Sequence, residues 1–375
     1  MSDAVFSAIR VEPLRFRGRG AVSRPAGRFE SAIRESDPDH DPGLPCLPEA
    51  PASKPTRVSR EAARSIISRN RSPDIFFEQS ANPYRGCEHG CVYCYARPNH
   101  AYLGLSPGLD FETELVVKPD AAARLAHELS APGYRCSPIV LGTATDAYQP
   151  LEREWRVTRS MLEVLAASAH PVAVITKASL IERDIDLLAS MAARGLAAVY
   201  ISITTLQPDL ARRWEPRAAA PWRRLQTVRR LSQAGIPVGV MLAPLVPFLN
   251  EPEIEQVLAA AAEAGARSAH YTVLRLPNEL EQVFTDWLHA HFPDRADRVL
   301  ARLADMRPAG RLNDARFHHR MRGEGAWAQL IGMRFALACR RSGLVRDRPS
   351  LDCTRFRPPS QAAQRDLFDP AHTDR

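Results

Sequence analysis

Residues 172–203, VAVITKASLIERDIDLLASMAARGLAAVYISI, carry the pattern that decides the fold. The stretch opens on the apolar, β-branched run Val172–Ile175 and closes on a second such run, Val199–Ile203. Between them, apolar residues recur at helical spacing from Ile181 to Arg194, and Gly195 stands where a helix C-cap belongs. Strand, helix and strand in this order predict a βαβ unit, and therefore two parallel strands.

The same alternation continues on both sides of this stretch. The sequence predicts four further strands, at Ile75–Phe77, Ile139–Leu141, Val238–Met241 and His270–Leu274. It also predicts helices at Ala121–Leu129, Glu154–Ser168, Ala220–Ala234 and Pro252–Ala264. With six such units, two fewer than a closed eight-fold barrel, the predicted fold class is α/β: a partial (βα)6 TIM-type barrel with a flexible N-terminal extension and a C-terminal helical region.

Composition divides the rest of the chain into flanking regions. Residues 1–72 are rich in Arg and Pro and are expected to form a largely irregular extension, with a short helix at Ser59–Ser68. Residues 73–275 form the expected barrel core, and residues 346–375 an Arg- and Pro-rich flexible tail. Residues 276–345 form the helical region, with helices predicted at Leu280–His291, Arg295–Ala304 and Trp327–Arg341.

Composition also bounds the class of protein. The chain has 375 residues, of which 45% are hydrophobic and 25% charged, and this mix is typical of a globular enzyme. No apolar run approaches the roughly 20 residues of a membrane span, and the N-terminus lacks the apolar core of a secretory signal. We therefore expect a cytoplasmic protein. The net charge of +7 permits a polyanionic partner such as nucleic acid, although an excess of arginine is common in ordinary enzymes.

Three of the seven cysteines crowd into residues 87–94, CEHGCVYC. The C-x3-C-x2-C spacing allows Cys87, Cys91 and Cys94 to ligate three irons of a [4Fe–4S] cluster, and leaves the fourth iron open to a cosubstrate. An alternative is a zinc site completed by His89 or His100, although zinc ligands usually come as two distant pairs. A simple electron-transfer ferredoxin would need a fourth cysteine and a far smaller chain.

A first strand, this cysteine motif and the following strand–helix units together resemble the radical S-adenosylmethionine (SAM) superfamily over Asp74–Arg275. The resemblance implies a [4Fe–4S] cluster whose open iron is chelated by SAM, and a reductant such as flavodoxin or ferredoxin. It further implies reductive cleavage of SAM to a 5′-deoxyadenosyl radical that abstracts a hydrogen atom from the substrate.

The resemblance also suggests site residues at the carboxyl ends of the strands, where ligands bind in parallel α/β folds. Lys177, Ser202 and Tyr95 resemble the spore photoproduct lyase branch, which repairs a thymine dimer in DNA. Tyr95 is then the candidate catalytic residue. The candidate SAM-binding residues are Tyr93, for the adenine, and the strand-end residues Thr143, Thr145, Asp146, Lys177 and Ser202. Each of the strand-end residues could instead only satisfy its own strand end or face solvent.

The sequence departs from that branch after the second strand. The Gly-Gly-Glu motif with which many relatives bind the SAM amine is replaced by residues 142–146, GTATD. Spore photoproduct lyase carries a hydrogen-donating cysteine at this strand end, where the present chain has Gly142 and Thr143. Cys136 precedes the strand and would lie at its opposite end. The lyase reaction itself is therefore not expected. Glu215 and Arg217, on a later loop, could contact SAM or the substrate.

These observations leave the substrate open. The leading hypothesis is a radical SAM enzyme whose substrate is nucleic acid, as in DNA repair. The alternatives are RNA, a peptide or a small metabolite, and, outside enzymes, an Fe–S or zinc scaffold that binds nucleic acid without catalysis. In the tail, residues 364–368, QRDLF, resemble the short motifs that bind the replication sliding clamp. This candidate docking peptide begins at Gln364 and ends at Phe368.

Overall fold

The computed structural model describes residues 16–30 and 54–359. Its main sheet has the strand order β10-β9-β8-β7-β6-β3-β2. Within these described ranges, the six strands from β3 to β10 in this sheet run parallel, and β2 joins the edge antiparallel. Their bounds are β2(Ile67–Arg69), β3(Gln79–Ala81), β6(Ile139–Leu141), β7(Val172–Thr176), β8(Ala197–Ser202), β9(Val238–Leu245) and β10(Ser268–Val273). The open order confirms the predicted partial barrel.

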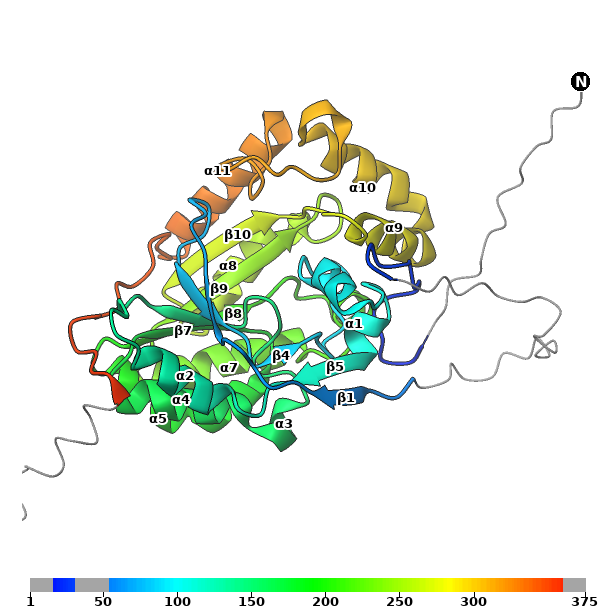
Figure 1. Ribbon diagram of the computed structural model, residues 1–375. Helices are drawn as coiled ribbons and strands as arrows, with labels where there is room; N and C mark the ends of the chain where they lie inside the picture. Colours follow the sequence, from blue (N-terminus) through cyan, green and yellow to red (C-terminus); the bar gives the residue numbers. More distant parts are fainter. Residues whose placement is uncertain (1–15, 31–53, 360–375) are drawn as a thin grey trace, which may run out of the picture.

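Helices cover the outer face of this curved sheet (Figure 1). The residues of β8 show why the sheet is buried on both sides. Ala197, Val199 and Ile201 pack into the main core under the helices, whereas Ala198 and Tyr200 join a second cluster on the inner face. The covering helices are α2(Ala121–Leu129), α4(Val157–Ala167), α5(Ile185–Ala192), α7(Pro221–Gln233) and α8(Ile254–Glu263).

Two of the predicted helices are divided. The one predicted at Glu154–Ser168 consists of α3(Glu152–Trp155) and α4, which are separated by Arg156 in the left-handed region, at φ 51°. The one predicted from Ile181 begins as the 3-10 helix η2(Ser179–Asp184) and continues as α5. A further helix, α6(Pro208–Trp214), follows β8 and was not predicted.

The predictions before the cysteine motif were wrong in two places. Residues 59–68 form no helix, because residues of β1(Arg57–Arg60) pair with β5(Glu114–Val117) and β2 pairs with β3. β5 also pairs with β4(Tyr84–Arg85), which completes a small second sheet. The first barrel strand is Gln79–Ala81 rather than Ile75–Phe77. Its polar residues obscured it in the sequence, since the Gln79 side chain is buried and donates to the Arg135 carbonyl at 3.1 Å.

The C-terminal helices lie beside the open edge at β10 (Figure 1). They are α9(Leu280–His291), α10(Pro293–Asp305) and α11(Gly325–Arg341), and α11 packs on α8. The short 3-10 helices η1(Arg97–Leu103), η3(Glu251–Glu253) and η4(Pro308–Gly310), with α1(Asp110–Thr113), complete the elements of the described chain. None of the helices in these described ranges is long and apolar enough to cross a membrane.

The segment after α11 crosses the amino-terminal end of the barrel. The amide of Asp352 donates to the carbonyl of Gly195, directly before β8, and the amide of Arg357 donates to that of Ser168, before β7. The Arg348 guanidinium lies 3.9 Å from the centre of the Phe76 ring. Residues 346–359 of the expected tail are therefore packed against the barrel. The sliding-clamp motif at 364–368 lies outside the described residues.

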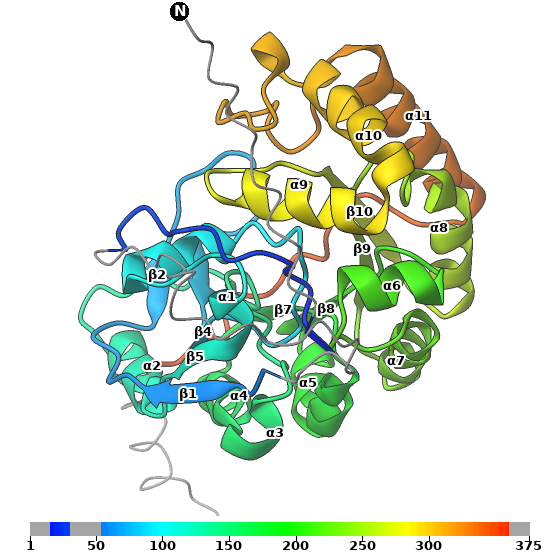
Figure 2. The same ribbon diagram turned by 90° about the vertical axis from the view of Figure 1, so that its right-hand side faces the viewer.

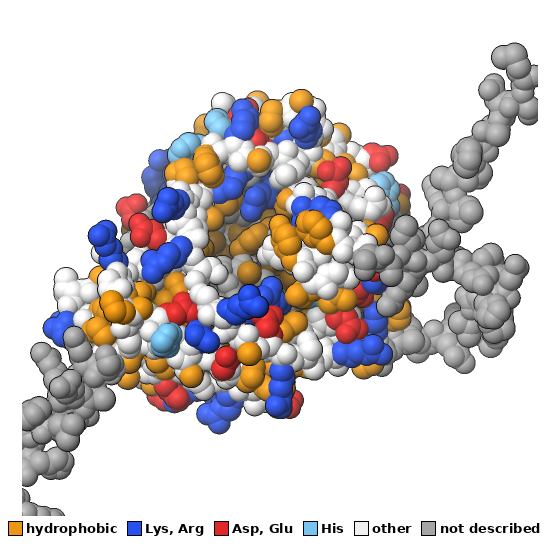
Figure 3. Space-filling view, viewed as in Figure 1, with side chains coloured by type: hydrophobic (Ala, Val, Ile, Leu, Met, Phe, Trp, Pro, Cys, Tyr) orange, Lys and Arg blue, Asp and Glu red, His pale blue; other side chains and the backbone are white. Residues whose placement is uncertain are grey.

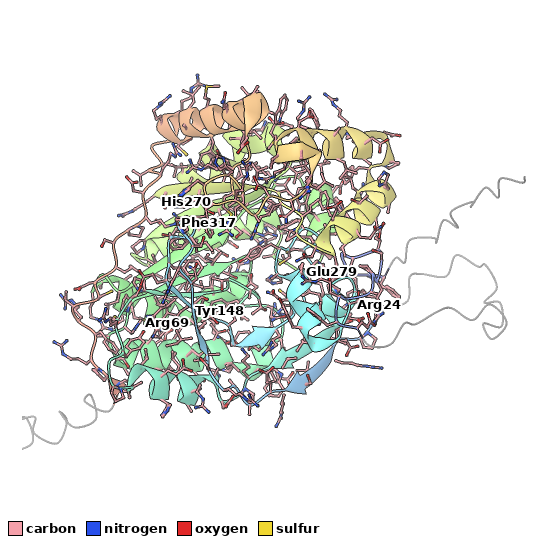
Figure 4. All side chains as sticks on the ribbon, turned by 45° about the horizontal axis from the view of Figure 1, so that its top comes forward. Arg24, Arg69, Tyr148, His270, Glu279 and Phe317 are labelled. Atoms are coloured by element: carbon pink, nitrogen blue, oxygen red, sulfur yellow. The ribbon has the colours of Figure 1, made fainter. Side chains whose placement is uncertain are left out.

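Residues 16–30 have no helix or strand but run along α1 and reach the start of α9 (Figure 2). Arg24 pairs with Asp110 of α1 at 2.8 Å, and Arg28 pairs with Glu279, directly before α9, at 2.8 Å. Figure 4 shows Arg24 and Glu279 on the same side of the molecule. This part of the extension is irregular, as expected, yet it is tied to the core by ion pairs.

Candidate active site

The three predicted cluster ligands lie in one loop between β4 and η1. Gly86 and Gly90 adopt left-handed φ angles of 73° and 67°, which favour glycine. A Cβ on Gly86 would lie 2.8 Å from the carbonyl oxygen of Phe111, and one on Gly90 would lie 2.7 Å from the Glu112 carboxylate. Conformation and space therefore both require glycine on this loop. The Cys87 and Cys91 side chains are buried, and Cys94 is more open.

A buried ion pair supports the cysteine loop through hydrogen bonds to its backbone. Arg97 is completely buried and pairs with the equally buried Glu112 at 2.5 Å. The guanidinium also donates to the carbonyls of Cys91 at 2.8 Å and Gly90 at 3.1 Å. The Glu112 carboxylate accepts from the amides of Gly20 and Ala21, each at 2.8 Å. These extra hydrogen bonds offset the cost of removing the two charges from water, so the pair holds the cysteine loop and the N-terminal segment together.

Thr145, a predicted SAM contact, bonds to the cysteine loop. Its hydroxyl donates to the Gly86 carbonyl at 2.7 Å and accepts from the Gln149 side chain at 3.0 Å. Gln149 is completely buried, and its carbonyl oxygen accepts from the amide of Glu88 at 2.9 Å. We infer that Thr145 positions the loop. Gln149 was not predicted, because a single glutamine carries no spacing signal.

Asp146, another predicted SAM contact, joins the loop to β7. Its carboxylate accepts from the Thr176 hydroxyl at 2.6 Å and from the amide of Lys177 at 2.8 Å. The His89 Nδ1 atom lies 3.2 Å away, in ion-pair contact but off the direction of a hydrogen bond. Burial alone would raise the pKa of Asp146, but His89 and these donors outweigh it and hold that pKa well below its usual range.

Tyr93 is locked by a buried polar cluster behind the loop. Its hydroxyl donates to the Glu215 carboxylate, which also accepts from the Thr204 hydroxyl at 2.9 Å and pairs with Arg224. Burial raises the pKa of Glu215, and the Arg224 guanidinium opposes that rise. The Tyr93 ring packs edge-on against Trp214 at 5.1 Å. Arg224 was missed in the sequence because an arginine on a helix normally faces water.

The remaining predicted residues lie at the ends of neighbouring strands. Lys177 follows β7, and its ammonium lies 5.7 Å from the centre of the Tyr93 ring. Ser202 ends β8, is 4% exposed, and accepts at its carbonyl from Arg224 at 3.0 Å. The Tyr95 hydroxyl donates to the carbonyl of Thr143, after β6. The fold thus brings all of these predicted residues to the edge of the sheet that carries the cysteine loop.

Arg217, singled out in the sequence, lies on the outer side of the cysteine loop. Its amide donates to the His89 carbonyl at 3.3 Å, and its guanidinium pairs with Glu88 at 3.1 Å. The amide of Val92 donates to the Trp214 carbonyl at 3.1 Å. The end of α6 and the segment that follows it therefore hold the loop in place.

The surface is hollowed in front of the sheet. Figure 3 shows apolar side chains inside the hollow and Lys and Arg side chains around its rim. Tyr95 is half exposed, and the Arg275 guanidinium lies 5.5 Å from the centre of its ring. An aromatic ring backed by a cation suits a planar or anionic ligand.

The cysteine loop fits a cubane cluster better than a single metal ion. Within residues 16–30 and 54–359, no three His, Cys, Asp or Glu side chains converge closely enough to hold one ion, so the zinc alternative lacks a ligand set there. A cubane has no such requirement, because each thiolate binds a different iron. Burial raises the pKa of the Cys91 thiol, and the Lys177 ammonium opposes part of that rise.

Comparison with known proteins agrees with this geometry. Residues 81–261 match the family model of the radical SAM superfamily. Members of that superfamily use a [4Fe–4S] cluster and SAM.

The related sequences are themselves uncharacterized proteins. The chain is 37% identical over 224 residues to one from Mycobacterium tuberculosis (strain H37Rv), a match that covers 59% of the chain and 66% of that protein. It is 25% identical to one from Methanocaldococcus jannaschii, across 46% of the chain and 62% of that protein. The chain therefore spans just under two thirds of the length of these relatives.

Among solved structures, the fold is similar to that of spore photoproduct lyase. The lyase complexed with dinucleoside spore photoproduct matches at a TM-score of 0.53 and 14% identity, over 76% of this chain and 80% of that one. A lyase mutant with bound AdoMet and the dinucleoside matches with the same values. At this identity the likeness concerns the fold.

Proposed function

We propose that this protein is a radical SAM enzyme that holds its [4Fe–4S] cluster on Cys87, Cys91 and Cys94. One observation carries the proposal: the cysteine loop lies beside the carboxyl ends of parallel strands, where Lys177 and Ser202 also lie. When bound, the cluster and SAM would supply a one-electron cleavage of SAM and a carbon radical that takes a hydrogen atom from the substrate.

The residues around the loop suit the parts of SAM. In this proposal the Lys177 ammonium pairs with the carboxylate, and the Ser202 hydroxyl bonds the ribose or carboxylate oxygens. The Tyr93 ring, whose hydroxyl is tied to Glu215, offers a fixed surface for the adenine. Thr143 completes the set on the side of β6, while Thr145 and Asp146 orient the loop.

For the substrate we propose nucleic acid. Beside Tyr95 and Arg275 lies Arg320, which is close enough to Arg275 to lower the pKa of its guanidinium, after the larger effect of burial. The Arg320 guanidinium pairs on one side with Asp74 at 2.6 Å and lies 4.8 Å from the ring of Phe317, which is 51% exposed. Aromatic rings that alternate with guanidinium groups can stack bases and pair with phosphates. Tyr95, the ring nearest the loop, is our candidate catalytic residue.

Anaerobic purification tests the cluster. The protein should be brown and contain about four irons per chain. Replacing Cys87, Cys91 and Cys94 by alanine should leave a folded, colourless protein, whereas Cys136→Ala, before β6, should keep the colour. Stoichiometric zinc without iron after anaerobic reconstitution would contradict the cluster assignment.

Turnover and capture test the rest of the proposal. With dithionite, the protein should convert SAM to 5′-deoxyadenosine and methionine, and the triple cysteine variant should not. Crosslinking in cells should capture DNA or RNA, and Arg275→Ala/Arg320→Ala should reduce the yield. Capture of protein alone would overturn the nucleic-acid proposal and leave the radical SAM assignment standing.

A further inference from the structure

A basic pocket of about 540 Å³ lies on the outer side of the cysteine loop. It is built by four parts of the chain that are distant in the sequence. None of the strand-end residues proposed to bind SAM contributes to it. Its lining consists of Arg17, Gly18, Arg19, Lys54, Pro55, Thr56, Glu88 and Arg217.

The loop itself forms part of the pocket wall. Glu88 directly follows the ligand Cys87, and Arg217 is anchored by its amide to the His89 carbonyl. On the N-terminal side, Gly20 lies so close to the loop that a Cβ there would come within 1.9 Å of the Gly90 carbonyl oxygen. A molecule seated in the pocket would thus be one residue away from a cluster ligand.

The pocket lining carries four cationic side chains and one carboxylate. That carboxylate, of Glu88, is occupied by Arg217 at 3.1 Å and by the Thr56 hydroxyl at 2.8 Å. Burial lowers the pKa of Arg19, and the nearby Arg217 guanidinium lowers it further, against the opposing effect of Glu112 and Glu88. The positive charge extends to the exposed Arg57, which lies 4.0 Å from Glu114, while the Lys54 ammonium lies 3.5 Å from Asp110. The rim therefore presents excess positive charge.

We propose that this pocket and its rim dock an acidic electron-transfer protein that reduces the cluster. This inference rests on the proposed function, since it assumes a cluster on the loop. One electron would leave the reduced flavin or iron–sulfur centre of the donor and enter the oxidised cluster, and no bond is made or broken. Charge complementarity of this kind steers a partner and speeds association.

A protein fits these observations better than a small anion does. The Arg19 guanidinium already donates to the carbonyls of Lys54 at 2.6 Å and Glu112 at 2.8 Å. Arg217 is likewise occupied by Glu88. The guanidinium groups of Arg19 and Arg217 are thus engaged within the chain. The exposed charges, on Arg17 and Arg57, lie at the rim of the pocket. A broad acidic surface can reach that rim.

The test is calorimetric titration of the full chain with oxidised flavodoxin at low salt, followed by stopped-flow reduction of the cluster by flavodoxin hydroquinone. In Arg17→Glu/Lys54→Glu, affinity and reduction rate should fall by about tenfold or more, while reduction by dithionite should not change. The matched control Arg229→Glu/Arg341→Glu alters the net charge equally at exposed sites on α7 and α11, and it should bind nearly as the parent does.

The outcomes separate this inference from the proposed function. Equal losses in both double variants, or no loss in either, would overturn the docking site even if the cluster is present. So would saturable binding of inorganic phosphate that is lost in Arg17→Glu/Lys54→Glu while flavodoxin binding persists. Because titration does not require a cluster, flavodoxin binding that persists in the triple cysteine variant would support the docking site even if iron is never found.

Discussion

Lys177 follows β7 and Ser202 ends the neighbouring β8, and their side chains are the polar groups proposed to bind SAM directly. Replacing either by alanine should weaken SAM binding by about 1–3 kcal/mol, because a charge-assisted or buried hydrogen bond is lost. Equilibrium binding of SAM to the reconstituted protein measures the effect. Ser160→Ala is the control and should bind SAM normally, because this half-buried serine of α4 bonds the Arg156 carbonyl directly before its own helix. Unchanged affinity in both strand-end variants would show that these two residues do not bind SAM.

At Gly142, the end of β6 has no side chain to donate a hydrogen atom. The residue has a φ of 89°, and a Cβ there would lie 2.0 Å from the Ile175 carbonyl oxygen, so a cysteine cannot be accommodated without movement. Cys136 lies before β6 and faces Cys353 of the C-terminal segment. We expect no efficient repair of spore photoproduct, as measured by chromatography of the products. Weak activity through Tyr95 would be compatible with this expectation. Complete conversion to two thymines without trapped adducts would contradict it.

At the scale of elements, the cysteine loop depends on a segment about seventy positions before it, in which the amides of Gly20 and Ala21 bond to Glu112. Gly20→Ala places a methyl group against the Gly90 carbonyl oxygen, at 1.9 Å in the present geometry. The contact joins a Cβ fixed to the backbone of residue 20 with the backbone carbonyl of Gly90, so only a shift of the backbone can relieve it. We expect residues 16–30 to detach or the loop to shift, with loss of iron.

Limited proteolysis and the iron content of the purified variant check this expectation. Gly18→Asn is the matched control. Its site has open space within 4 Å and a φ of 73°, which asparagine tolerates better than other side chains. The control should keep its iron and its resistance to protease. Normal iron content and resistance in Gly20→Ala would show that the segment does not support the loop.

At the scale of the whole molecule, buried histidines make the fold sensitive to acid. Burial lowers the pKa of His100 and of His170 to about 4, from an ordinary value of 6.5. Both side chains are almost completely buried. The two histidines are therefore protonated near pH 6.5 in the unfolded chain, but only near pH 4 in the folded chain. Stability should be complete above pH 6.5 and fall by about 3 kcal/mol per ring as the pH drops through this window.

Urea unfolding between pH 7 and pH 4 measures this loss. His170→Gln should reduce the proton uptake on unfolding by about one. His289→Gln, at an exposed position on α9, should leave the uptake unchanged. Equal pH slopes in the parent and in His170→Gln would contradict the assignment. His170 also packs against Phe356 at 5.1 Å, so acid should loosen the C-terminal segment as well.

What the sequence by itself determined is the local and periodic part of this protein. The helices Ala121–Leu129 and Leu280–His291 and the strand Ile139–Leu141 have the predicted bounds, because an apolar stripe or a buried run is written within the element itself. The parallel order of the strands followed from their alternation with helices. The cysteine motif likewise needed no long-range information, since the spacing of three thiols on one loop is a local property.

Only the tertiary structure decided the contacts between remote segments. Arg97 and Glu112 are isolated charged residues in the sequence, and their burial becomes understandable only when Gly20 and the loop carbonyls supply partners. The strand Gln79–Ala81 is polar because its side chains are satisfied from other segments. The basic pocket likewise joins residues 17–19, 54–56, 88 and 217. A buried polar group needs a hydrogen-bond partner, which can come from any part of the chain. Such long-range pairings produce no periodic pattern in the sequence, so they could not be predicted from it.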